Sequence, residues 1–346
     1  MKSTWKPISI LIVTLTVILG IMMAAFSLPA VHSGINDLPI GIISSNSNYK
    51  SISKPLKDKG FNVSKYKDVK DVKSNINKRK IYGAIEIDKN GNVNVYKATA
   101  ASASVAQVLT QMGTQLVNKQ QALGRQVINQ NLAKTNNVNI IKVLNQKLAA
   151  LDKKQANVVE VKSFPKSDPK GAGLAAGALP IALGGWIGAV AISLFIKGKK
   201  EKLLSVIGFA IVGGLGLVGV IQFGIGTFNG NYLLTSMGAM LGIGATGMFV
   251  LGILEVMGNA GLGIAAVILI LLGNPLSGLT SAPEMLPSGW GELGQLLPPG
   301  ATGTLLRNIV FFHGNDIVQA VSVLSCYVLL GLILFAVGKK SNIVKA

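Results

Sequence analysis

The stretch that decides the fold runs from Leu203 to Gly226 and reads LLSVIGFAIVGGLGLVGVIQFGIG. It contains no charged residue, and a helix of about 20 apolar residues is enough to cross the hydrocarbon core of a bilayer. We therefore predict a membrane-spanning helix here. The whole chain agrees, because 49% of its 346 residues are hydrophobic and its mean hydropathy is +0.50. Such values exclude a disordered chain and are not typical of a soluble domain.

Five further apolar stretches predict a polytopic α-helical membrane protein with six spans. The predicted spans are 8–28, 173–196, 203–226, 234–255, 257–276 and 317–338. The first is longer than the apolar region of about 7–15 residues in a cleaved signal peptide, so we expect a retained anchor, with a signal peptide as the alternative. Glu255 is predicted at the water-exposed end of the fourth span, where its charge costs little, and we expect no proton-relay role for it.

Lysines in short connections set the expected orientation. They are Lys2 and Lys6 before the first span, Lys197, Lys199, Lys200 and Lys202 between the second and third, and Lys339, Lys340 and Lys345 after the sixth. With six spans all three groups fall on one side, and lysines of short loops stay in the cytoplasm. We therefore expect a multi-pass protein of the bacterial plasma membrane with both termini inside.

Residues 29–171 differ in composition from the apolar regions around them. They hold 21 Lys and 2 Arg against 9 Asp and Glu, a net charge of +14. We predict three parts, which are a membrane anchor at 1–28, an extracellular α+β domain at 29–171 inserted between spans one and two, and a five-span membrane domain at 172–346. The basic charge is compatible with this topology, because long loops translocate largely regardless of charge.

Apolar periodicity predicts alternating strands and helices in the domain 29–171. Strands are expected at 39–43, 61–63, 81–87, 93–95 and 158–161, and helices at 49–59, 69–76, from 102 onward and at 140–151. The dipeptide Asn90-Gly91 is typical of a hairpin turn. The long helix carries an apolar seam at Val105, Leu109, Met112, Leu116, Leu123 and Val127. Two interpretations stay open: the seam packs on the domain's own sheet, or it forms a stalk that pairs with a second copy or a partner.

The sequence holds no recognisable motif for catalysis or metal binding. The two histidines, His32 and His313, are far apart and Cys326 is the only cysteine, so neither a zinc site nor a nucleophilic triad is supported. The letters from Gly214 to Gly219 match a dinucleotide-binding fingerprint, but they lie inside a predicted span and not after a strand. We predict no catalytic, cofactor or metal site and no enzyme activity.

Two further features bear on packing and partners. Glycines four residues apart predict close helix packing, and the candidates are Gly184 with Gly188 and Gly238 with Gly242. The basic outer domain could bind an anionic cell-surface polymer, or it could be a solvated lysine-rich surface. Lysine lacks the bidentate geometry of arginine, which argues against a specific phosphate site. We expect membrane lipid as a partner and no nucleic acid.

The segment from Gly273 to Phe312 is dense in proline and glycine but carries few charges. This composition predicts an outer re-entrant or interfacial segment at about 277–316, built of short helices buried against protein; an ordinary surface loop is the alternative. The side chain of Asn274 could cap the backbone that is freed beside Pro275. The candidate outer gate consists of Gly273, Asn274, Pro275, Pro283, Glu284 and Pro287.

A family resemblance is carried by this same segment. The runs Asn274-Pro-Leu-Ser-Gly278, Pro283-Glu-Met-Leu-Pro287, Leu297-Pro-Pro-Gly300 and Leu305-Leu-Arg-Asn308 resemble the region before the last span of type-2 ABC exporter permeases, especially the YhgE/Pip-like branch. The run Ile81–Ile87 resembles a strand of that branch's outer domain. The resemblance implies a permease half that forms a homodimer or heterodimer and moves an amphipathic or polymeric substrate outward, energised by a separate ATPase.

The chain departs from that family at two places. The ATPase docks there on the loop between spans two and three, and the candidate coupling loop here is short, comprising Lys197, Lys199, Lys200, Glu201 and Lys202. Only a few residues precede Ile8, where the family carries an amphipathic cytoplasmic helix. An alternative function therefore stays open, that of a membrane-anchored surface protein, a receptor or secretion accessory, which acts through its extracellular domain.

Overall fold

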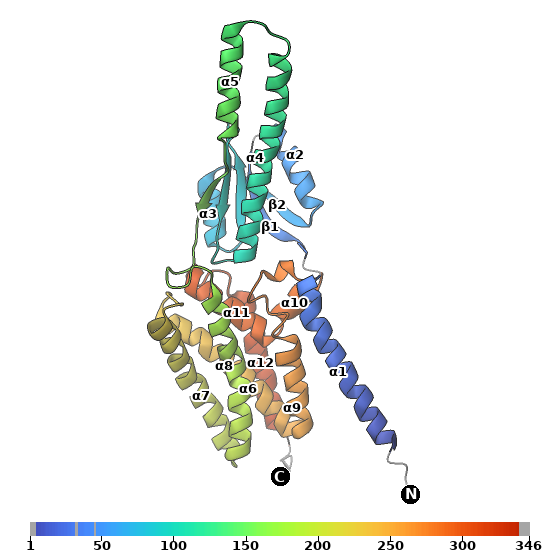
Figure 1. Ribbon diagram of the computed structural model, residues 1–346. Coiled ribbons are helices and arrows are strands. Elements are labelled where there is room, and N and C mark those ends of the chain that lie inside the picture. Colours follow the sequence, from blue (N-terminus) through green and yellow to red (C-terminus); the bar gives the residue numbers. More distant parts are fainter. Residues whose placement is uncertain (1–4, 32–33, 45, 339–346) are drawn as a thin grey trace. The chain divides into compact units, whose positions relative to one another are not determined.

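The computed structural model describes residues 5–31, 34–44 and 46–338, and it is mostly helical (Figure 1). The chain divides into two compact units, and each is described by itself. Asp37–Ser163 is called the sheet unit, and Met1–Asn36 with Phe164–Ala346 is called the helical unit. Several residues used to predict the topology lie outside the described ranges, namely Lys2, Lys339, Lys340 and Lys345, as does His32.

Five strands form one mixed sheet in the described part of the sheet unit. They are β1 (Leu38–Ile43), β2 (Phe61–Tyr66), β3 (Gly83–Ile87), β4 (Val93–Lys97) and β5 (Asn157–Glu160). In the order β2-β1-β3-β4-β5, strand β1 is parallel to β2 and β3, whereas β4 is antiparallel to β3 and parallel to β5. The predicted hairpin forms the β3–β4 pair, and Gly91 in its turn has φ +75°, a left-handed conformation that suits glycine.

Helices connect these strands and supply the rest of the core. They are α2 (Asn46–Lys57), α3 (Val69–Asn77), α4 (Ala103–Leu132) and α5 (Val138–Asp152). The first half of α4 packs on β3 and β4, where Gly113 lies against Val95 and Gly83 lies against Leu109. The first part of the apolar seam is therefore a contact with the domain's own sheet, as one of the two interpretations predicted. Beyond Val117 the described helix has no buried residue.

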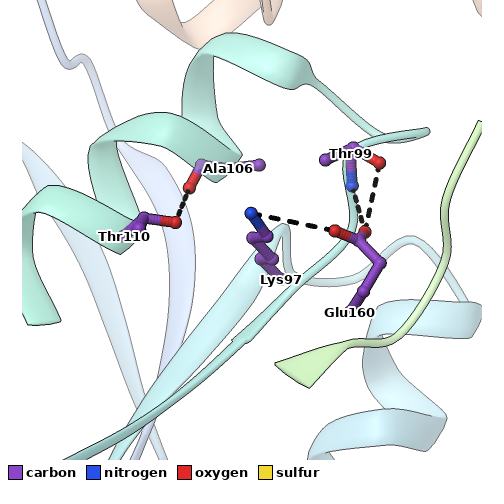
Figure 2. Close-up of polar contacts among 5 residues, drawn as sticks. All are labelled: Lys97, Thr99, Ala106, Thr110 and Glu160. Carbon is purple, nitrogen blue, oxygen red and sulfur yellow. Dashed lines mark hydrogen bonds and ion pairs between the residues drawn. The ribbon is translucent and has the colours of Figure 1, made fainter. Parts of the chain in front are cut away.

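Glu160 fastens the edge strand β5 to the chain that follows β4 (Figure 2). Its carboxylate accepts hydrogen bonds from the N–H and the hydroxyl of Thr99 at 2.8 and 3.1 Å, and it lies 3.9 Å from the ammonium of Lys97. In the adjoining turns of α4, the Thr110 hydroxyl donates to the Ala106 carbonyl. Because β5 re-enters the sheet after α4 and α5, these contacts close the base of that helical hairpin.

The helical unit is built from apolar helices with short connections. Its elements are α1 (Trp5–Val31), α6 (Ala172–Phe195), α7 (Lys199–Gly219), the π-helical η1 (Val220–Ile225), α8 (Tyr232–Met257), α9 (Asn259–Ala266), the π-helical η2 (Val267–Leu272), the 3₁₀ turn η3 (Pro283–Met285), α10 (Trp290–Gln295), α11 (Pro298–Phe312) and α12 (Val318–Val337). Among the described residues, four helices are long and apolar enough to cross a membrane, and these are α6, α7 continued by η1, α8 and α12. The protein is therefore a helical membrane protein by length and composition.

Two other predicted spans correspond to shorter apolar helical stretches. The stretch predicted at 257–276 is a helix over Asn259–Leu272, in which α9 continues into η2, and α1 contains the apolar stretch Ile12–Ala24. The helix over Asn259–Leu272 stops early because Gly273 and Pro275 follow it, and proline has no N–H for the helical ladder. The predicted span thus ends in a break and not in a regular helix.

Helix α8 is the centre of the helical unit. Of its apolar window, 78% is buried, against 33% or less for the other three long helices. It packs against α6, α7, α11 and α12, and the ring of Phe249 on α8 meets that of Tyr327 on α12 edge to face at 5.0 Å. A movement of α8 must therefore displace these helices as well.

Candidate functional site

The predicted outer gate lies in residues 273–297, where irregular chain and short helices replace a regular membrane-spanning helix, here called the broken segment. It begins where η2 ends, with the Gly273 N–H donating to the Ile268 carbonyl in the wide π-helical pattern. It then turns at Gly278, whose φ is +66°, and passes through η3 and α10 before α11 starts at Pro298. Residues 276–279 are buried, so the polar groups of this backbone need partners inside the protein.

Side chains from α10 and α11 supply those partners. The Arg307 guanidinium, which is 4% exposed, donates from Nη2 to the carbonyls of Gly278 and Leu279 at 3.3 and 2.9 Å. The Gln295 amide donates to the Ser277 carbonyl at 3.0 Å, and Gln295 in turn accepts from the Thr304 hydroxyl at 2.6 Å. Three consecutive carbonyls are thus held by side chains in place of a helical ladder.

The middle of the broken segment is held by Asn36, which follows α1 in the chain. The Asn36 N–H donates to the Glu284 carbonyl at 2.8 Å, and the Asn36 side-chain amide donates to the Leu286 carbonyl at 2.5 Å. Pro283, Glu284 and Pro287 are half-buried. Hydrogen bonds from other parts of the chain thus hold the broken segment at the carbonyls of residues 277–279 and at those of residues 284 and 286.

Asn274 does not act as predicted. Its hydrogen bonds among the described residues run through the main-chain carbonyl, which accepts from the Ser277 N–H at 3.2 Å and from the Ser277 hydroxyl at 2.7 Å. A serine three residues downstream can reach this carbonyl because the chain forms a tight turn there. The capping side chain beside Pro275 is therefore that of Ser277.

Glycines allow the broken segment to pack main chain against main chain. A Cβ at Gly291 would overlap the Pro283 carbonyl, and a Cβ at Gly294 would overlap that of Leu276. Gly273, the first predicted gate residue, lies against the Leu269 carbonyl and the Pro299 ring. Such contacts leave no space for small adjustments, so the segment is built to keep one geometry.

A second polar cluster lies where α7 begins and where α8 and α12 end. The Lys202 ammonium donates to the Glu255 carboxylate at 2.5 Å, with side chains 11% and 6% exposed. The prediction that Glu255 faces water is therefore wrong, because Lys202 turns inward from the start of α7 and covers it. A buried charge of this kind is tolerated when it is paired.

Two of the five predicted coupling residues, Lys199 and Lys202, are used within this cluster. The Lys199 ammonium donates to the carbonyls of Phe335 and Gly338 at 3.2 and 2.5 Å, which binds the end of α12 to the start of α7. The Glu201 carboxylate lies against Gly198 at the positive N-terminal end of α7. Only Lys197, Lys200 and Glu201 are exposed.

The predicted packing glycines have different environments. Gly188 lies against Phe209 of α7, Gly238 against Ile309 and Leu305 of α11, and Gly242 against Thr302 of α11. Gly184 has nothing within 4 Å of a Cβ position. The close approach of α6 to α8 occurs instead at Gly185, against Thr246 and the Ile243 carbonyl.

Sequence reasoning missed the side chains that hold the broken segment. Arg307 had a usable signal, because it is the only lysine or arginine between Lys202 and Lys339, and a lone charge in apolar surroundings is expected to have a specific partner. Asn36 and Gln295 had no comparable signal, since polar residues at chain connections are common.

The described residues do not bring three or more His, Cys, Asp or Glu side chains together as a metal site would require. Comparisons with protein-family models, with curated proteins and with solved structures find no match. The fold and the two polar clusters together define a helical membrane protein that contains a partly buried, irregular segment with short helices.

Proposed function

We propose that the chain is a permease subunit of a type-2 ABC-like exporter in the bacterial plasma membrane. Its six spans would be α1, α6, α7 with η1, α8, α9 with η2, and α12, with both termini inside and the sheet unit outside. It would act as a homodimer or heterodimer and move an amphipathic or polymeric molecule outward. A separate ATPase would supply the energy, since no Walker A sequence occurs in the chain.

One observation carries this proposal, namely that the buried Arg307 and the half-buried Gln295 satisfy three consecutive carbonyls of the broken segment. Non-helical backbone at membrane depth is stable only where it is buried in protein or lines a water-filled cavity. A protein that is merely anchored needs one span and gains nothing from such a segment. Arg307 and Gln295 hold it in a defined geometry, as the closed state of an outer gate requires.

The contacts also suggest how a push from an ATPase would reach this gate. Lys197, Lys200 and Glu201 are exposed where α6 meets α7, and the Lys202–Glu255 pair joins the start of α7 to α8. Helix α8 in turn packs on α11 through Gly238 and Gly242, and α11 carries Arg307. Force on the exposed turn would thus pass through α8 and α11 to the carbonyls of Gly278 and Leu279.

A second function, that of a membrane-anchored receptor or secretion accessory, is favoured by a different observation. Lys199 and Lys202 are used inside the protein, so the exposed charges of the coupling loop are few. A small docking surface would suit a chain that has no ATPase partner. In that case the sheet unit would carry out the receptor or accessory function.

Co-purification of an ATPase with the chain from native membranes separates the two functions. The tagged full-length chain is purified with any bound partner and reconstituted in nanodiscs. Phosphate release from ATP is then measured for the wild type, for Lys197→Glu/Lys200→Glu and for the exposed control Lys153→Glu. The permease proposal expects ATP hydrolysis that the double variant loses and the control retains. Hydrolysis no greater than in a mock purification would instead support the receptor or accessory function.

A further inference from the structure

The outer parts of α4 and α5 form a two-helix hairpin that extends past the sheet (Figure 1). Its register is set near its base, where Gly124 lies against Leu151 and the Gln121 amide donates to the Leu151 carbonyl at 3.0 Å. Helix α5, all of whose residues are described, has no buried residue. The outer parts of α4 and α5 therefore cover each other's apolar side chains only in part.

Four exposed apolar side chains lie on one side of this hairpin. Leu123 and Val127 are each 56% exposed, and Ile140 and Val143 are 47% and 49% exposed. Each of the four directly precedes a half-buried residue of its own helix, namely Gly124, Ile128, Ile141 and Leu144. The half-buried residues mark the side on which α4 and α5 pack together, so each exposed residue is rotated by about 100° from that side in the same sense. In an antiparallel pair, equal rotations lead to the same side, because the pair's two-fold axis is perpendicular to the plane of the two helices.

The four residues, here called the band, lie at successive levels along this side of the hairpin. With residue 124 opposite 151, Val143 and Ile140 fall level with residues 132 and 135 of the chain that follows Val127. Leu123, Val127, Val143 and Ile140 therefore follow one another toward the tip over about 18 Å, at about 1.5 Å per residue. This length matches about three turns of a partner helix.

Apart from Asp152 at the end of α5, the charged residues of the hairpin are all basic. No acidic residue occurs between Asp88 and Asp152. The basic residues in that interval on the hairpin are Lys119, Arg125, Lys134, Lys142 and Lys147, all exposed. Among them Arg125 pairs with Asp152 at 2.9 Å. Two such hairpins would repel one another, whereas an acidic partner would be attracted.

We propose that the band of Leu123, Val127, Val143 and Ile140 docks one amphipathic helix of a partner protein, whose apolar stripe is flanked by Asp and Glu. The partner helix would cover the band and complete a three-helix core that α4 and α5 cannot build alone. Its carboxylates would lie near the lysines of the hairpin. An anionic polymer would satisfy the lysines but leave the apolar band uncovered.

The test uses the full-length chain in phosphatidylcholine nanodiscs and labelled peptides of about 20 residues, long enough to form a helix. One peptide has a leucine stripe with glutamate flanks, its twin has the same stripe with lysine flanks, and polyglutamate serves as the anionic polymer. Fluorescence anisotropy measures binding. We expect the glutamate-flanked peptide to bind at least about tenfold more tightly than its twin and than polyglutamate, and to weaken with salt.

Matched variants show whether the band is the site. Leu123→Gln/Val127→Gln should weaken binding of the glutamate-flanked peptide by at least about tenfold, since two central apolar anchors are lost. Val138→Gln, which changes an apolar residue of the same hairpin that is 77% exposed and lies off the band, should leave it unchanged. Circular dichroism confirms that both variants keep their helices.

Two results would overturn the proposal. Equal binding of polyglutamate and the glutamate-flanked peptide, unaffected by Leu123→Gln/Val127→Gln, would make the hairpin a site for an anionic polymer. Mass photometry of nanodiscs that each hold one chain would detect pairing of two discs through their chains. If such pairing occurred and the same double substitution abolished it, the band would be assigned to a second copy.

Discussion

At the scale of single residues, the Lys202–Glu255 pair places two opposite charges inside the protein, largely out of contact with water. Removing one partner leaves the other buried and uncompensated, which costs about 3–5 kcal/mol, whereas an apolar pair of similar volume is often neutral. We therefore expect Glu255→Gln to lower the melting temperature in detergent strongly, and Lys202→Met/Glu255→Leu to recover most of the loss. The exposed neighbour change Lys200→Met should be silent. Equal melting temperatures for Glu255→Gln and wild type would show that water reaches the carboxylate.

Tyr96 offers a second prediction at this scale, because its pKa is strongly perturbed. Burial, together with the hydrogen bond that its hydroxyl donates to Glu86 at 2.7 Å, raises the pKa of Tyr96 well above its usual value. The folded state thus favours the neutral hydroxyl. This stabilisation is complete below the unfolded pKa of about 10 and is lost as the pH rises toward the folded pKa. The melting temperature of the sheet unit should therefore fall more steeply with rising pH above pH ~10 in wild type than in Tyr96→Phe. Parallel plots of melting temperature against pH would contradict this.

At the scale of elements, two neighbouring glycines of α6 provide a matched comparison. A Cβ at Gly185 would overlap Thr246 and the Ile243 carbonyl of α8, whereas Gly184 faces open space. Gly185→Ala should destabilise the protein by about 1–3 kcal/mol through overpacking. Gly184→Ala should be neutral or slightly stabilising, since alanine favours helix. Thermal stability in detergent, followed by size-exclusion chromatography, distinguishes them; the opposite order would mean that α6 is rotated from the described packing.

The same comparison shows how far sequence predicts elements. The strands and the β3–β4 hairpin could be predicted because local signals, alternation and Asn90-Gly91, act over a few residues. The four-residue spacing of Gly184 and Gly188 indicated a packing helix but not which face of it meets α8. The seam of α4 was similarly ambiguous, since Leu109 is buried on the sheet whereas Leu123 is exposed. Apolar periodicity identifies the face of a helix that is expected to be buried. Only the tertiary structure shows which other element packs on that face.

The two polar clusters were beyond sequence reasoning for a related reason. Lys202 and Glu255 are 53 residues apart, and Arg307 lies 29 residues after Gly278. No local pattern links such positions, and there the structure replaced two predictions, the water-facing Glu255 and the capping Asn274. The break at Gly273 and Pro275 could be predicted, because proline and glycine end a helix wherever they occur.

At the scale of the whole molecule, the sheet unit should fold without the helical unit. It contains five strands with a core of its own that includes Leu38, Ile40, Ile85 and Leu109. Expressed alone, residues 37–163 should show a cooperative thermal transition by far-ultraviolet circular dichroism, as small single domains do. Ala84→Asp, which places a charge at a position that is 0% exposed, should abolish that transition. A gradual melt of the wild-type fragment would mean that its core depends on the rest of the chain.

The arrangement of the whole chain across the membrane is the remaining prediction, and it follows from the lysines of the short connections. Because positive residues in short loops are retained in the cytoplasm while long loops translocate largely regardless of charge, the turn between α6 and α7 should be inside and the sheet unit outside. The single, exposed Cys326 is first replaced by serine. Asn136→Cys in the exposed turn between α4 and α5 should then react with a membrane-impermeant maleimide on intact cells, and Lys197→Cys should react only after the membrane is opened. Labelling of position 197 alone on intact cells would invert the topology, and with it the direction in which any transported molecule would meet the broken segment.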